Sequence, residues 1–159
     1  MVGHDPVFAA RNVSGEIRFS PQSSVSAELR LAISTGSLSV QNDINDKDRR
    51  EIERTMRDEV LEVSKYPDVT FASSSGKVET VGDGRYRVEV DGDLSLHGVK
   101  HRQRLSAQVF TMGETLRAQG EFQIRQTDYG IKLVSAAGGT LKIKDDVKIS
   151  FDLLARKGT

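Results

Sequence analysis

Residues 24–33, "SVSAELRLAI", alternate between polar and apolar side chains up to Leu31. A β-strand points successive side chains to opposite faces, so this period of two places five apolar residues of the segment on one side. The apolar set is Val25, Ala27, Leu29, Leu31 and Ile33. One dry face and one wet face are typical of an antiparallel sheet that covers a core. The segment therefore predicts an antiparallel strand.

The same alternation recurs along most of the chain. It is found in residues 13–19, 69–71, 86–96, 105–109, 116–125, 141–143 and 147–153. Turn sequences such as "SPQSS" at 20–24 and "GDG" at 82–84 separate several of these segments. Seven or eight short strands predict an all-β sandwich or barrel. A closed barrel is favoured because closure removes unpaired strand edges.

One segment, residues 46–62 "DKDRREIERTMRDEVLE", has a helical period instead. Ile52, Met56 and Val60 are four residues apart and form a narrow apolar stripe, as in an amphipathic helix that lies on an apolar rim. Asp48 and Glu51 resemble a capping box at its start. Pro67 ends the helical segment before the next strand, because proline disfavours helical geometry in the preceding residue. We expect a lid over one mouth of the barrel.

Composition excludes several classes of function. The 159 residues are interpreted as one domain, with 23 basic and 23 acidic side chains and no cysteine. A net charge of zero argues against nucleic acid as a partner, and no apolar run is long enough for stable membrane insertion. The opening "MVGHDPVFAARN" lacks a secretory signal, which predicts a cytoplasmic protein, or a periplasmic one if a signal has been removed.

Candidate catalytic groups are weakly supported. His97 and His101 are four residues apart, but they flank a predicted turn at Gly98, where this spacing does not bring two side chains together. We interpret them as surface turn histidines. Asp145 and Asp146 have lysine neighbours and resemble a solvated turn. Neither pair predicts a metal site or acid–base catalysis.

Serine chemistry and phosphate binding are also unsupported. The serines at 73–75 are expected at a strand end and have no G-x-S-x-G elbow around them. Gly138 and Gly139 lack the strand, helix and spacing of a phosphate loop. The sequence predicts a protein without cofactor or catalytic residues.

Four segments resemble successive signature blocks of the YceI family of lipocalin-like, polyisoprenoid-binding proteins. They are "VSKYPDVTFASS" at 63–74, "GDLSLHGV" at 92–99, "GEFQIRQTDYGIKL" at 120–133 and "KDDVKISFDL" at 144–153. Their order and spacing agree with the family over residues 13–153. The resemblance implies an antiparallel eight-stranded barrel that holds a polyisoprenoid, a quinone or a fatty-acyl chain. The first family strand is expected to be short, missing or supplied by "VFAARNV" at 7–13.

The resemblance and the apolar strand faces together predict the residues that contact such a lipid. They are Phe19, Leu29, Leu31, Met56, Phe71, Leu94, Phe122, Ile124, Tyr129, Ile149 and Phe151. Arg125 is the candidate for the lipid headgroup, since a polar group at the end of an apolar cavity fixes the orientation of a ligand. The motif from Arg125 to Gly130 has an alternative, structural interpretation as a bend at which Tyr129 plugs the barrel.

The interior is either filled by side chains or open to a ligand, because eight strands allow both. Small residues on the apolar faces favour a cavity: Gly15, Ala27, Ala107, Ala118 and Gly120. Two functions follow. The first is a lipid carrier or storage protein. The second is a structural or stress-response interaction module with a filled barrel, whose open strand edge forms a homodimer.

Overall fold

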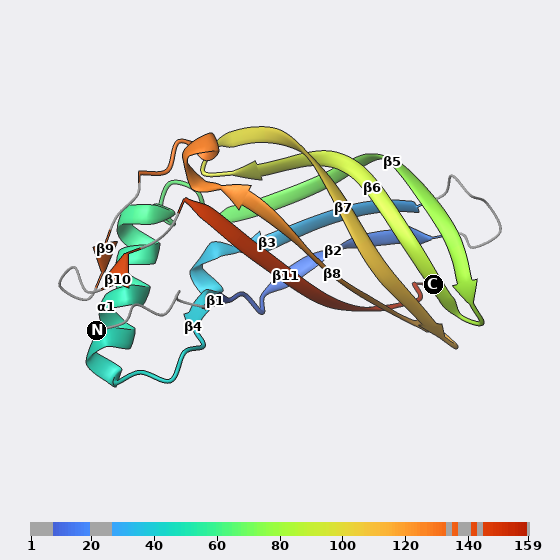
Figure 1. The fold of residues 1–159 in the computed structure, drawn as a ribbon, viewed down its shortest axis with the longest axis horizontal. Helices are drawn as coiled ribbons and strands as arrows, with labels where there is room; N and C mark the ends of the chain where they lie inside the picture. Colours follow the sequence, from blue (N-terminus) through green and yellow to red (C-terminus); the bar gives the residue numbers. More distant parts are fainter. Residues whose placement is uncertain (1–7, 20–26, 133–134, 137–140, 143–144, 159) are drawn as a thin grey trace.

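A single antiparallel sheet dominates the structure, a computed structural model that describes residues 8–19, 27–132, 135–136, 141–142 and 145–158. Seven strands form this sheet in the order β11-β8-β7-β6-β5-β3-β2 (Figure 1). They are β2 (Val13–Phe19), β3 (Ala27–Ser34), β5 (Asp68–Gly82), β6 (Arg85–Leu96), β7 (Val99–Met112), β8 (Thr115–Arg125) and β11 (Asp146–Arg156). The alternation read from the sequence is thus confirmed as strand.

Two short pairs supplement the sheet. β1 (Phe8–Ala9) pairs with β4 (Ser39–Val40), and β9 (Ser135–Ala136) pairs with β10 (Leu141–Lys142). The strand expected to be short at the beginning of the chain is therefore the two-residue β1. It pairs with β4 and adds no eighth strand to the main sheet. The 20–24 turn and Gly138–Gly139 lie outside the described residues.

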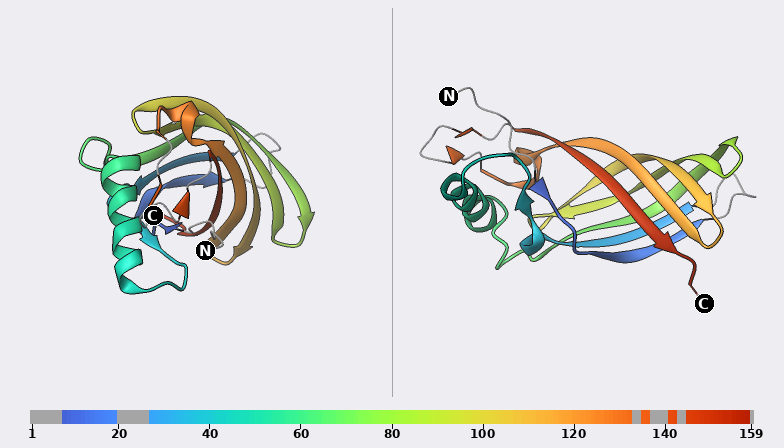
Figure 2. Two further views of the ribbon diagram at one scale, coloured as in Figure 1. Left: turned by 60° about the vertical axis from the view of Figure 1, so that its left-hand side comes forward. Right: turned by 90° about the horizontal axis from the view of Figure 1, so that it is seen from below.

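The sheet curls into a half-barrel, and helix α1 (Asp46–Thr55) lies at one of its ends (Figure 2). This confirms the predicted antiparallel, lipocalin-like architecture with one helix near the mouth. The edge strands are β2 and β11, and no ladder joins them in the described residues. We call the boundary between these two strands the seam. The β5–β6 and β7–β8 turns lie at the end opposite α1 (Figure 1).

The predicted cap of the helix at Asp48 is wrong, because α1 begins after Asn45. The Asn45 side chain accepts a hydrogen bond from the backbone N–H of Asp48 at 2.8 Å and donates its amide to the Asp48 carboxylate at 2.9 Å. Asparagine is among the best N-cap residues, since its short side chain reaches the unpaired N–H groups of the first turn. Asp48 thus lies inside the first turn.

The second half of the predicted helix differs from a regular α-helix. Met56–Val60 form a π-helical turn, in which the N–H of Leu61 bonds to the carbonyl of Met56 at 2.8 Å. Glu62 follows with φ 48°, a left-handed conformation unusual for a residue with a side chain. The chain leaves the helix there and reaches β5 through residues 63–67.

Strand β5 passes through the serines that were expected at a strand end. The register between β5 and β6 shifts between Ser73 and Ser75, which marks a β-bulge inside one continuous strand. The hydroxyl of Ser73 accepts the backbone N–H of Leu29 at 2.8 Å and so ties the bulge to β3. The prediction that the serines at 73–75 end a strand is wrong. A β-bulge interrupts the alternation of polar and apolar side chains just as the end of a strand does.

Candidate functional site

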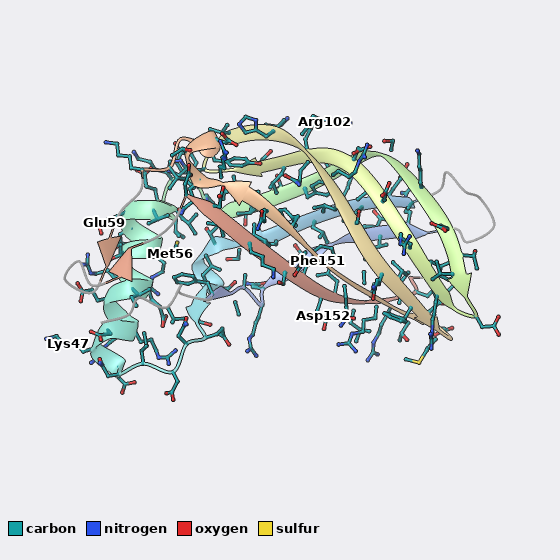
Figure 3. All side chains as sticks on the ribbon, viewed as in Figure 1. Lys47, Met56, Glu59, Arg102, Phe151 and Asp152 are labelled. Carbon is teal, nitrogen blue, oxygen red and sulfur yellow. The ribbon has the colours of Figure 1, made fainter. Side chains whose placement is uncertain are left out.

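The inner face of the sheet carries rows of apolar side chains that cross several strands. One row runs through Val78, Val88, Ala107, Gly120 and Phe151, each paired with the next across β5, β6, β7, β8 and β11. Paired residues point to the same face, so this row spans the interior of the half-barrel. Phe151 lines the interior, whereas its neighbour Asp152 on β11 is exposed (both are labelled in Figure 3).

A cavity of about 50 Å³ lies against this row, in the part of the sheet away from α1. Its wall is almost entirely apolar and comes from β2, β3, β6, β7, β8 and β11. The lining residues are Ile17, Arg18, Ala27, Glu28, Leu29, Val88, Val90, Leu105, Ala107, Val109, Leu116, Ala118, Phe151 and Leu153. We call this part of the interior the cavity half. It is the candidate ligand site.

The remainder of the interior, next to α1, is closely packed, and we call it the helix half. Its buried side chains include Phe71, Leu94, Ile124 and Tyr129. The ring of Phe71 covers Gly92 so closely that a Cβ on this glycine would lie 2.8 Å from the ring. The ring therefore fills the space beside Gly92.

The structure divides the predicted lipid-contact residues between the two halves. Leu29 and Phe151 line the cavity. Phe71, Leu94, Ile124 and Tyr129 are buried in the main core but do not line the cavity, and Met56, Phe122 and Ile149 pack against the same core. Leu31 is half-buried but does not line the described cavity, and the side chain of Phe19 lies outside the described residues.

Most of the lining was missed by the sequence prediction, which chose the largest apolar side chains. Ala27, Ala107 and Ala118 all line the cavity. Their small size was the signal that favoured an open interior, and it also marks where that interior is open. Gly120, another small inward residue, contributes no space, because a Cβ there would lie 2.5 Å from the Phe151 ring.

The two polar candidates of the 125–130 motif lie in different environments. Arg125 is exposed and pairs with exposed Asp146 at 3.6 Å, away from the described cavity. Tyr129 is 2% exposed, and burial raises the pKa of its hydroxyl. Gly130 ends this 3-10 turn, Gln126–Tyr129, with φ 68°. This geometry fits the structural interpretation of the motif, in which Tyr129 plugs the end of the sheet.

The end next to α1 is closed by two apolar contacts. Val60, at 1% exposure, joins the main core, and Met56 packs beside it. Ile52, also at 1% exposure, packs with Val40 in a second cluster. The stripe predicted from the sequence is therefore real, and its residues act as part of the core.

His97 is not a surface turn histidine, contrary to the sequence prediction. Its side chain is only 11% exposed. Its Nε2 lies 2.6 Å from the Glu62 carboxylate and its Nδ1 lies 3.1 Å from the Tyr129 carbonyl. Both ring nitrogens therefore lie within hydrogen-bond distance of an oxygen from another segment. The hydrogen bond from His97 lowers the pKa of Glu62.

These contacts join three segments that are far apart in the sequence. The ring of Tyr66, after the helix, lies 4.6 Å from the His97 ring between centroids. Thr35 donates its hydroxyl to the carbonyl of Pro67 at 2.8 Å. His101 contacts the Asp128 carbonyl at 2.6 Å and packs against the Tyr129 ring.

The contacts of His97 with Glu62 and with Tyr129 connect the exit of the helix to the 3-10 turn after β8. We call Glu62, His97 and Tyr129 the latch of the helix half.

The other polar candidates have structural contacts. Asp145 accepts both the N–H and the hydroxyl of Thr127, at 2.9 and 2.8 Å, and these bonds lower the pKa of its carboxyl. No group of three metal-binding side chains occurs in the described part of the chain. None of the described helices is long and apolar enough to span a bilayer.

Solved structures of similar fold were found at low sequence identity. BcnA of Burkholderia cenocepacia is 21% identical, with a TM-score of 0.71 over 93% of this chain and 86% of that chain. The YceI protein of Campylobacter jejuni is 19% identical, with a TM-score of 0.71 over 100% of this chain and 89% of that chain.

A polyisoprenoid-binding domain from Saccharophagus degradans, implicated in plant cell wall breakdown, is also 19% identical. Its TM-score is 0.65 over 97% of this chain and 92% of that chain. At such identities these likenesses show the fold alone. No curated protein sequence is significantly similar to this chain. The model of the YceI-like domain, however, matches residues 3–155, and the chain therefore belongs to the YceI family.

Proposed function

We propose that the protein binds an amphiphilic lipid with a long apolar chain and carries or stores it without chemical change. The observation that carries the proposal is the apolar cavity, to which six strands contribute. Burying a lipid chain there yields roughly 0.8 kcal/mol per methylene group. Such a surface selects a ligand by the length and the apolar character of its chain.

Family membership and a polyisoprenoid-binding structural relative support a lipid as the ligand. A polyisoprenoid, a quinone and a fatty-acyl chain share the chemistry that this cavity recognises. The polar contacts of the described histidines and of Asp145 support a binding protein over an enzyme, since each holds backbone segments together.

A matched pair of variants tests the cavity. Ala107 lines it, whereas its neighbour Ser106 is exposed on the outer face. Ala107→Leu adds three carbons to the cavity, and Ser106→Leu adds a similar side chain outside. Native mass spectrometry with a linear isoprenoid alcohol should show a bound complex for the wild type and Ser106→Leu, and a weakened one for Ala107→Leu. Equal binding by both variants would exclude the cavity as the site.

The alternative function, a self-associating interaction module, is favoured by a different observation. The helix half is filled by side chains, and β2 and β11 leave sheet edges without a ladder in the described residues. Such edges can pair with another chain. Light scattering gives the oligomeric state, and the native mass spectrometry described above gives isoprenoid binding. A dimer that binds no isoprenoid supports the interaction module, and a lipid-binding monomer supports the carrier.

A further inference from the structure

The cavity is too small for the ligand class proposed above, on which this inference rests. Its volume is about 50 Å³. Sites for small-molecule ligands usually have about 300–1,000 Å³. A long apolar chain therefore fits only after the walls of the half-barrel move apart. The question is which boundary between strands opens.

Ladders hold the sheet together beside the cavity, where β7 pairs with β8 from Ala107 opposite Gly120 to Met112 opposite Thr115. β11 pairs with β8 along its whole length, from Asp146 opposite Arg125 to Arg156 opposite Thr115. β6 pairs with β7 from Arg85 opposite Phe110 to Leu96 opposite Val99. Opening such a boundary would leave a row of backbone N–H and carbonyl groups without partners, which is costly away from water.

The seam differs, because no ladder joins β2 to β11 in the described residues. The number of strands in the described part of the sheet accounts for this. Each of the seven strands runs antiparallel to its neighbour, so the first and the last run in the same direction (Figure 1). Hairpin-type antiparallel pairing cannot close the barrel here. A parallel ladder uses a different, slanted hydrogen-bond pattern and is slightly less stable.

Side chains of both edges line the same space instead. Ile17 and Arg18 of β2 and Phe151 and Leu153 of β11 all line the cavity, so the two edges face each other across it. A boundary without a ladder can widen without breaking backbone hydrogen bonds. Of the boundaries beside the cavity, the seam therefore opens at the lowest cost.

Phe151 is placed to control this opening. It is half-buried on the edge strand β11, lines the cavity and rests on Gly120. Its ring thus fills the space that Gly120 leaves beside Ala107. A movement of β11 away from β2 would carry this ring with it and enlarge the cavity.

The end next to α1 has the opposite properties. Val60 and Ile52 are each 1% exposed, and the latch ties the helix exit to Tyr129. Entry at that end would have to break these contacts. We propose that the lipid chain enters sideways through the seam, with Phe151 as the gating side chain, while the end beside α1 stays closed.

Engineered cross-links test this route, since the chain has no cysteine of its own. Glu16→Cys with Ser150→Cys places two exposed thiols beside Ile17 and Phe151, on opposite sides of the seam. A flexible bis-maleimide joins them. Ser150→Cys with Glu121→Cys is the matched control, because these residues are paired in the β8–β11 ladder. Ser64→Cys with Lys100→Cys clamps the helix exit near the Tyr66–Gly98 contact.

The readout is the uptake of cis-parinaric acid, whose fluorescence rises in an apolar site. The seam cross-link should slow or reduce uptake roughly tenfold, because the open state is removed. The ladder and helix-exit cross-links, and the seam variant treated with a monofunctional maleimide, should behave like the wild type. Thermal unfolding confirms that each protein is folded.

Three results would overturn the proposal. Normal uptake by the seam-linked protein excludes the seam as the entrance. Loss of uptake only in the protein clamped at the helix exit would place the entrance beside α1. A wild type that takes up no parinaric acid would instead refute the proposed lipid binding, and the seam route with it.

Discussion

The two halves of the interior are built from the same strands but differ in packing. In the helix half, large side chains such as Phe71 and Leu94 fill the space, and the latch closes the end. In the cavity half, Ala27, Ala107 and Ala118 leave a gap beside β2 and β11, which no ladder joins within the described ranges. The difference shows that one sheet can be closely packed at one end and leave space at the other.

This division changes the role of the helix. A helix at the mouth of a barrel invites interpretation as a lid that opens for the ligand. Here the helical segment contributes two of the most deeply buried side chains of the protein, Ile52 and Val60. The mobile element that we propose is the edge strand β11.

The largest expected effect comes from enlarging a residue in the helix half. Gly92→Ala would push a methyl group against the carbonyl of Ala72 and the ring of Phe71. We expect a loss of about 3 kcal/mol, typical of severe overpacking. Ala107→Leu, which adds more atoms but in the cavity half, should cost about 1 kcal/mol. Urea denaturation measures both. Equal losses would mean that the two halves are packed alike.

The next effect concerns the helix. Met56→Lys brings a charge against the core of the helix half and should weaken docking of residues 46–62 by roughly 2 kcal/mol. Hydrogen exchange should rise in this segment before it rises in the strands. Asp58→Lys, at an exposed position, is the control. A uniform rise across all strands would show that the helix and the sheet unfold as one unit.

The latch predicts a pH effect of intermediate size. The pKa of Glu62 is lowered from 4.5, chiefly by the hydrogen bond from His97. A lowered pKa means that the hydrogen bond between His97 and the Glu62 carboxylate stabilises the fold at pH above about 4.5. This contribution is lost as the pH falls through the lowered pKa of Glu62. Hydrogen exchange around residues 62–66 should rise in acid. Glu62→Gln should remove this dependence, and an unchanged acid response in that variant would refute the assignment.

The smallest effect is expected on the outer face of the cavity half. The guanidinium of Arg117 lies 2.7 Å from the carboxylate of Asp152 and lowers its pKa to about 2. Both side chains are about half exposed, and such surface pairs contribute little. Asp152→Asn should leave lipid binding unchanged and thermal stability nearly so. A marked loss of binding would place the ligand outside the interior.

The strands and the helical stripe could be predicted from the sequence because periodicity depends on neighbours in the chain. The latch could not, since His97, Glu62 and Tyr129 meet only after folding. The lipid-contact prediction chose large residues, but large side chains such as Phe71 fill space, whereas small ones such as Ala107 leave it. The seam, which has no ladder in the part of the chain that the structure describes, depends on the count of strands, and alternation alone left that count at seven or eight.

The central claim is that a lipid chain is held by burial of its methylene groups inside the sheet. Calorimetry with linear isoprenoid alcohols of increasing length tests it most directly. Affinity should rise with each added unit, by up to roughly 0.8 kcal/mol per buried methylene, and then level off when the opened interior is full. An affinity that is independent of chain length would contradict the account.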